Sequence, residues 1–146
     1  REAMKNELFG LVRIITPNIP EAEEITGFKI GSTGAMREAA RAIKELGPEC
    51  VVVKGGHLTD EPDAVDIFFD GERFHELRSR RIDTKNTHGT GCTFAAAICA
   101  LLAKGASPIE AVKTAKEFVT GAIENSFTLG SGNGPLNHFW KMKEGE

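Results

Sequence analysis

A short, unbroken apolar run, CVVV at residues 50–53, limits the possible folds of this chain more than any other segment. A strand that is apolar on both faces is typical of the interior of a parallel sheet covered by helices on each side. A second β-branched run, LVRIITPN at residues 11–18, stops at Pro17 and predicts the preceding strand. Asn18, Glu21 and Lys54 are therefore expected just beyond strand ends, where α/β sheets bind their ligands.

Helical patterns surround these strands. We expect helices at residues 20–27 and 32–47, each with an N-terminal cap or Pro and a terminal Gly, and a charged helix ending near Phe9. Asp70-Gly71 predicts the turn of an edge β-hairpin over residues 63–79. The apolar segment 92–105 predicts a buried helix, and Ser107 with Glu110 predicts a capping box opening the next one. This alternation predicts an α/β sheet flanked by helices.

Composition excludes several classes of function. The 146 residues, 40% of them hydrophobic, suffice for one domain with a buried core. A net charge of −3 with mixed signs provides no field for nucleic acid, apart from a local RSRR patch at residues 78–81. The longest apolar segment, residues 94–103, is too short to cross a membrane, and the first residues lack a signal-peptide core. A cytoplasmic protein is expected.

Three cysteines without a CxxC pair predict neither disulfides nor a zinc site, which fits a reducing compartment. The four histidines also lack the spacing of metal ligands. Cys99 lies seven residues after Cys92 and is expected in the core, together with Phe94, Ile98, Leu101 and Leu102. Because the chain opens with Arg inside a helical pattern, we expect it to be a piece of a longer protein.

The segment NTHGTGCT, residues 86–93, carries the strongest chemical signal. A Gly-X-Gly turn that opens a helix gathers unpaired backbone N–H groups at the positive end of the helix dipole, which favours phosphate or developing negative charge. Gly89, Thr90 and Gly91 would form such an anion hole, and Cys92, whose thiolate the helix end favours, would act as a base or nucleophile. The alternative is a Gly-rich helix entry followed by a small buried cysteine. The segment lacks the Gly-Lys-[Ser/Thr] of a Walker A motif.

Lys54, before two flexible glycines, could reach phosphate oxygens, or it could be a surface lysine with a buried stem. Asn18 and Glu21 could hold a Mg²⁺ ion, directly or through its waters, because Mg²⁺ keeps several waters and takes few carboxylates. Glu21 could equally be an ordinary acidic residue in the first turn of a helix.

Four segments taken together, TPNIPEAEEITG, VVVKGGH, THGTGCTFAAAICALLAKG and GPLNHF, resemble the bacterial hydroxymethylpyrimidine and phosphomethylpyrimidine kinases of thiamine biosynthesis. These kinases belong to the ribokinase-like superfamily. The resemblance is ordered and runs almost end to end. It implies a three-layer ribokinase-like fold, of which residues 1–146 would be only the C-terminal portion of one kinase domain. The absent N-terminal half would supply the pyrimidine pocket, much of the lid and further strands.

The resemblance also implies a reaction. The family transfers the ATP γ-phosphoryl group to the hydroxymethyl group of a pyrimidine and then to the phosphate of that monophosphate. Gly89, Thr90 and Gly91 would form the anion hole, and Cys92 would take the position of the catalytic base. Lys54, Asn18 and Thr87 would contact ATP phosphates, and Glu21 would hold Mg²⁺ through water. The resemblance implies ATP and Mg²⁺ as cofactors. The implied partners are a small pyrimidine substrate, the missing half and a second copy in a homodimer. Neither nucleic acid nor a membrane is an expected partner.

Three hypotheses follow. The chain is part of a pyrimidine kinase that needs its other half, or a nucleotide-binding module without catalysis, or part of a related kinase acting on pyridoxal. In one respect the sequence departs from the family, because the tail reads GSGNGP where a His is expected before the second Gly-Pro. An isolated half of such a sheet would expose apolar surface, so we expect it either to dimerise or to derive from a folded parent by proteolysis.

Overall fold

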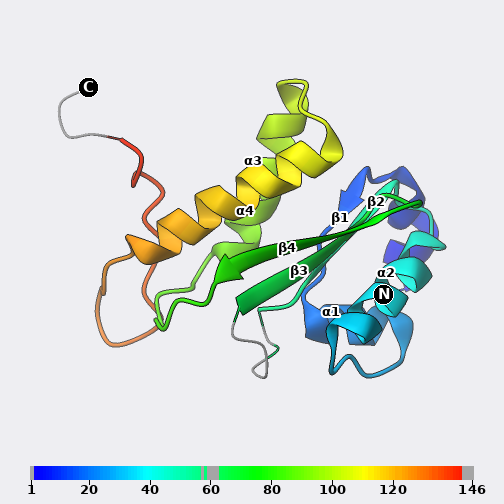
Figure 1. Ribbon diagram of the computed structural model, residues 1–146, viewed down its shortest axis with the longest axis horizontal. Coiled ribbons are helices and arrows are strands. Elements are labelled where there is room, and N and C mark those ends of the chain that lie inside the picture. Colours follow the sequence, from blue (N-terminus) through cyan, green and yellow to red (C-terminus); the bar gives the residue numbers. More distant parts are fainter. Residues whose placement is uncertain (1, 57, 59–62, 143–146) are drawn as a thin grey trace. The chain divides into compact units, whose positions relative to one another are not determined.

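The computed structural model describes residues 2–56, 58 and 63–142 (Figure 1). The chain divides into two compact units, residues 1–78 and residues 79–146, and each is described by itself. Within the described residues, no helix has the length and hydrophobicity that a membrane crossing requires.

The first unit is built on a four-stranded sheet in the order β1 (Ile14–Ile15), β2 (Cys50–Lys54), β3 (Asp63–Phe69) and β4 (Phe74–Arg80). The predicted interior position of β2 is confirmed, since it pairs in parallel with β1 and antiparallel with β3. Of these two pairings, only that of β2 with β1 is parallel, because the connection from β2 to β3 is short. Only residues 55–62 connect β2 to β3, which is too short for the crossover that a parallel pair requires.

Two helices, α1 (Ile19–Thr26) and α2 (Thr33–Lys44), pack on the sheet. Their buried side chains and those of one sheet face form the core, in which Met36, Ile43, Val51, Val53 and Ile67 are all fully buried. Both helices begin where the sequence predicts, but α2 ends at Lys44 instead of Gly47.

The termini of these elements follow local sequence. The predicted N-terminal charged helix is present as a π-helix, η1 (Met4–Leu8), followed by a short 3-10 helix, η2 (Phe9–Leu11), in which Phe9 is buried. The hairpin turn is confirmed. Asp70 Oδ1 accepts hydrogen bonds from the backbone N–H groups of Glu72 (2.8 Å) and Arg73 (2.6 Å), and β4 is an edge strand.

In the second unit, α3 (Thr90–Ala103) packs beside α4 (Pro108–Glu124) (Figure 1). The predicted capping box of Ser107 and Glu110 is present. The predicted anchoring role of Trp140 is also confirmed, since its Nε1 donates a hydrogen bond to the Phe118 carbonyl (3.1 Å) and its ring lies against Gly121.

The prediction that α3 is buried all round is wrong. Phe94 and Ile98 are buried, but Leu101 and Leu102 are only half-buried, and Cys99 is exposed rather than in the core. The exposed residues recur at intervals of three and four and therefore lie on one face of the helix. This α3 face consists of Cys92, Ala95, Ala96, Cys99, Ala100 and Ala103.

Candidate functional site

The start of α3 has the local geometry expected of an anion hole. Gly89 is the N-cap residue, with a left-handed backbone (φ 88°) that favours glycine. It has no side chain with which to cap the helix, so the first-turn N–H groups depend on other acceptors. Among the described residues, the N–H groups of Gly91 and Cys92 have no hydrogen-bond acceptor. Two donors at the positive end of a helix dipole favour an anionic ligand.

The loop before α3 supports this turn through backbone contacts. Thr90 donates to the carbonyl of Thr87 through both its N–H (3.3 Å) and its hydroxyl (2.7 Å), and Thr93 N donates to Gly89 O (2.9 Å). Thr87 is exposed, and so is the Cys92 thiol, which contradicts the alternative of a buried structural cysteine. A thiol exposed in the first turn of a helix can exchange a proton with a bound hydroxyl group.

Asn18 and Glu21 form a capping box at the start of α1. Asn18 Oδ1 accepts from Glu21 N (2.9 Å), and Glu21 Oε2 accepts from Asn18 N (2.8 Å). Both members of the pair therefore cap the helix, and one Glu21 oxygen is engaged by this bond. Among the described residues, no group of three or more His, Cys, Asp and Glu side chains could hold a metal ion.

Lys54 lies at the end of β2 next to Asn18, as the sequence predicts. Its N–H donates to the carbonyl of Pro17 (2.9 Å), and Asn18 and Lys54 form a parallel bridge. Asp66, which sequence reasoning missed, fixes Gly55, the residue after Lys54. Its Oδ1 accepts a hydrogen bond from Gly55 N (2.9 Å), and Asp66 is only 8% exposed. The sequence signal was an acidic residue inside the apolar strand DAVDIFF.

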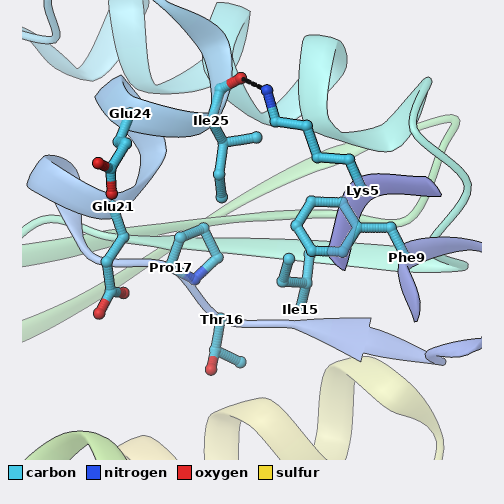
Figure 2. Close-up of a pocket in the computed structure, with 8 residues that line it drawn as sticks. All are labelled: Lys5, Phe9, Ile15, Thr16, Pro17, Glu21, Glu24 and Ile25. Carbon is cyan, nitrogen blue, oxygen red and sulfur yellow. Dashed lines mark hydrogen bonds between the residues drawn. The ribbon is translucent and has the colours of Figure 1, made fainter. Parts of the chain in front are cut away.

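A cavity of about 410 Å³ opens between the end of β1 and α1 (Figure 2). Phe9, Ile15, Pro17 and Ile25 provide its apolar walls, and Glu21 and Glu24 lie along one side. Lys5 is also part of the lining, and its ammonium group donates to the carbonyl of Ile25 (2.8 Å). Such walls suit a small ring or an apolar side chain.

The predicted site residues thus form two groups, each coherent within its own unit. Asn18, Glu21 and Lys54 meet in the first unit, whereas residues 87–92 form one turn of the second. His57, which ends the VVVKGGH motif, lies outside the described residues. Cys50, Cys92 and Cys99 are free thiols in this structure.

A sequence profile of the phosphomethylpyrimidine kinase family matches residues 1–137. The chain belongs to this family. The predicted resemblance is therefore confirmed.

Individual family members and solved structures agree with this assignment. The chain is 44% identical over 143 residues to the hydroxymethylpyrimidine/phosphomethylpyrimidine kinase of Streptomyces coelicolor, covering 98% of this chain and 52% of that protein. It matches the pyridoxal kinase of Bacillus subtilis in complex with ADP (TM-score 0.90, 45% identity, 94% of this chain and 54% of the other). It likewise matches the Staphylococcus aureus pyridoxal kinase in complex with AMP-PCP (TM-score 0.90, 40% identity, 94% and 50%).

These matches confirm the mixed α/β, ribokinase-like fold. The chain spans about half the length of each of these three proteins.

Sequence reasoning about this family member also missed a second set of residues, in the tail. The Thr93 hydroxyl lies 2.8 Å from His138 Nε2, and the buried Asn86 packs against Gly134. The motif GPLNHF was the available signal.

Proposed function

We propose that this chain takes part in the ATP-dependent phosphorylation of 4-amino-5-hydroxymethyl-2-methylpyrimidine and of its monophosphate, a step of thiamine biosynthesis. The observation that carries the proposal is the start of α3. Gly89 opens the helix without a side-chain cap, and the N–H groups of Gly91 and Cys92 have no acceptor among the described residues. A family of phosphomethylpyrimidine kinases needs such donors for the oxygens of the transferred phosphoryl group.

The proposed transfer needs few groups. The substrate hydroxymethyl oxygen attacks the γ-phosphorus of ATP, the bond from that phosphorus to the bridging oxygen of ADP breaks, and the hydroxyl proton passes to the thiolate of Cys92. In the turn formed by Gly89, Thr90 and Gly91, the N–H groups of Gly91 and Cys92 would hold the negative charge of the transferred group. Thr87 and Lys54 would contact other phosphate oxygens. Positioning and electrostatic stabilisation contribute most of the rate in phosphoryl transfer. For the second phosphorylation the acceptor is already an anion, so a strong base is unnecessary.

The residues present could hold a Mg²⁺ ion only if water and phosphate supplied most of its ligands. Glu21 Oε2 accepts the Asn18 N–H, which leaves one carboxylate oxygen for a bound water. Mg²⁺ commonly uses one or two carboxylates together with substrate phosphates, and when bound it would neutralise phosphate charge. Asn18 would orient Glu21 and contact phosphate.

We further propose that the chain is the C-terminal part of one kinase domain and that the remaining half covers the α3 face. Most residues of α3 are apolar, yet only Phe94 and Ile98 are buried. The relatives named above are about twice as long as this chain, so their folds contain an additional half that could occupy such a face. Small side chains on the face would let a packed sheet or helix approach closely. The same half would supply the acceptor pocket, and a homodimer is the alternative occupant.

A second candidate is the phosphorylation of pyridoxal. It is favoured by the two solved structures with a TM-score of 0.90, both of proteins named pyridoxal kinase. The same start of α3 would serve both reactions, because a hydroxymethyl group on an aromatic ring is the acceptor in each.

The test measures ATP-dependent phosphorylation of hydroxymethylpyrimidine and of pyridoxal by this chain, alone and together with the N-terminal half of the Streptomyces kinase. Turnover of the pyrimidine would support the first proposal, and turnover of pyridoxal alone would favour the second. ATP binding without turnover in either arrangement would instead indicate a nucleotide-binding module.

The catalytic role of Cys92 has a matched control on the same helix face. Cys92→Ala should lower turnover by about 100-fold or more while ATP still binds, as expected for loss of a general base. Cys99→Ala removes the other exposed thiol of the helix, two turns beyond the candidate anion hole, and should lower turnover far less. Equal turnover in the two variants would contradict the role of Cys92.

A further inference from the structure

The tail segment, residues 134–140, is fastened to α4. Leu136 is only 3% exposed, and the N–H of Asn137 donates to the carbonyl of Ala122 (3.0 Å). At the end of the segment, Trp140 donates to the carbonyl of Phe118 (3.1 Å). Two hydrogen bonds and a buried leucine thus fix the tail segment along a helix that does not itself contain the candidate anion hole.

The tail segment also contacts the loop that precedes α3. The N–H of His88 donates to the carbonyl of Gly134 (3.3 Å), and His88 and Pro135 form a parallel bridge. Gly134 lies so close to the amide side chain of Asn86 that an added Cβ would overlap with it. Asn86 is only 5% exposed, so it has little room to move away. The position therefore requires glycine.

His138 extends this contact to the helix itself. Its Nε2 and the hydroxyl of Thr93 lie 2.8 Å apart and share a hydrogen bond, whose donor depends on the imidazole tautomer. Thr93 also makes the first backbone bond of α3, from its N–H to the carbonyl of Gly89 (2.9 Å). His138 therefore contacts the residue that closes the first turn.

The first turn needs such support because of its composition. Gly89 and Gly91 leave the backbone more conformational freedom than other residues, and helix ends open more readily than helix interiors. An N–H group binds an anion well only if it is already oriented. A side chain anchored through α4 can restrict the turn without occupying the space in front of its N–H groups.

We propose that His138 is a positioning residue for the anion hole, acting through the Thr93 hydroxyl to hold the N–H groups of Gly91 and Cys92 in their binding orientation. This inference rests on the proposed function for the identity of the ligand. The restraint of the first turn of α3 by His138 does not depend on it. The tail thereby acquires a role that involves no direct contact with the nucleotide.

The test uses four single variants of the full chain and one double variant. His138→Ala and Thr93→Val each remove one partner of the hydrogen bond, and His138→Gln retains a side-chain amide that can still bond to Thr93. Phe139→Ala is the matched control, because Phe139 is adjacent in the tail and 71% exposed. The readouts are amide hydrogen exchange of residues 88–93 and the affinity for ATP, measured by calorimetry in the absence of an acceptor.

We expect His138→Ala to speed exchange in residues 88–93 but not in α4, and to weaken ATP binding about 3- to 10-fold, the range for one net hydrogen bond. His138→Gln should restore most of the slow hydrogen exchange and most of the nucleotide affinity. Adding Thr93→Val to His138→Ala should have no further effect, because both changes remove the same bond. Two results would overturn the inference: additive effects of His138→Ala and Thr93→Val in the double variant, or hydrogen exchange in His138→Ala as slow as in Phe139→Ala.

The two proposals fail in distinguishable ways. If the unmodified chain does not bind ATP, the proposed function loses its support, while hydrogen exchange still decides whether His138 restrains the turn. If the unmodified chain binds ATP and His138→Ala binds it equally well, the positioning role is refuted and the proposed function is unaffected.

Discussion

Replacing Gly55 by Ala should destabilise the first unit strongly, because the strand end at Lys54 is built around this glycine. A Cβ at Gly55 would overlap with the carbonyl oxygen of Val65 and lie 2.9 Å from Met36 Cε, whereas carbon atoms in contact are normally about 3.5–4.0 Å apart. Met36 is fully buried, and Val65 belongs to β3, so neither can move freely. Overpacking of this kind typically costs about 1–3 kcal/mol, and the backbone overlap places Gly55→Ala near 3 kcal/mol.

The measurement is urea unfolding, monitored by the reactivity of the Cys50 thiol, which is buried in β2, the strand that ends just before Gly55. With a slope of about 1.5 kcal/mol/M, a loss of 3 kcal/mol lowers the midpoint by about 2 M. Gly56→Ala is the matched control, since a Cβ there would meet nothing within 4 Å, and it should shift the midpoint by less than about 0.3 M. Equal midpoints for the two variants would refute the packing argument.

Three further predictions concern single side chains. Burial, aided by the nearby charges of Glu49 and Asp70, raises the pKa of Cys50 to about 11. At pH 8 a thiol reagent should therefore label the two α3 cysteines quickly and Cys50 only after unfolding. Rapid labelling of all three cysteines would be contrary evidence. The N–H groups of the hairpin turn hold the pKa of Asp70 below its usual value, so its stabilisation is present above the unfolded-state pKa near 3.8 and is lost as the pH falls through the folded-state pKa. Asp70→Asn should therefore lower the midpoint of urea unfolding at pH 7 but not in strong acid, and an equal loss at both would contradict this. In the second unit, a Cβ on Gly121 would overlap with the ring of Trp140, so Gly121→Ala should shift the fluorescence of this sole tryptophan to the red, whereas Gly132→Ala should leave it unchanged.

Sequence reasoning succeeded where the physical cause is local. The start of α1 could be predicted because Asn18, Pro20 and Glu21 satisfy the helix end within a single turn. The start of α3 could be predicted for a similar reason, since a Gly-rich turn before a helix creates free N–H groups wherever the helix lies in the fold. These segments needed no information about distant parts of the chain.

It failed where a partner distant in sequence decides the outcome. Asp66 could not be assigned, because its role depends on the antiparallel register that places it opposite Lys54. The contact between Thr93 and His138 joins residues 45 positions apart. For α3, an apolar helix was correctly expected, but whether its surface is buried depends on what packs against it, and periodicity cannot show that.

The candidate magnesium role of Glu21 can be separated from its capping role by one pair of variants. Glutamine at this position can still accept the Asn18 N–H, whereas alanine cannot, so Glu21→Ala should cost about 1 kcal/mol of stability and Glu21→Gln only a few tenths. The glutamine variant, however, removes the negative charge that a hydrated cation would require.

If Glu21 only caps α1, the Mg²⁺ dependence of ATP binding should be the same in Glu21→Gln as in the unmodified chain. If Glu21 also holds Mg²⁺ through water, the glutamine variant should need several-fold more Mg²⁺ for half-maximal ATP binding while its thermal unfolding stays nearly unchanged. We expect the second result, because only Oε2 is engaged by the cap. A normal Mg²⁺ dependence in the glutamine variant would restrict Glu21 to its structural role and leave Lys54 and the start of α3 as the groups that bind phosphate.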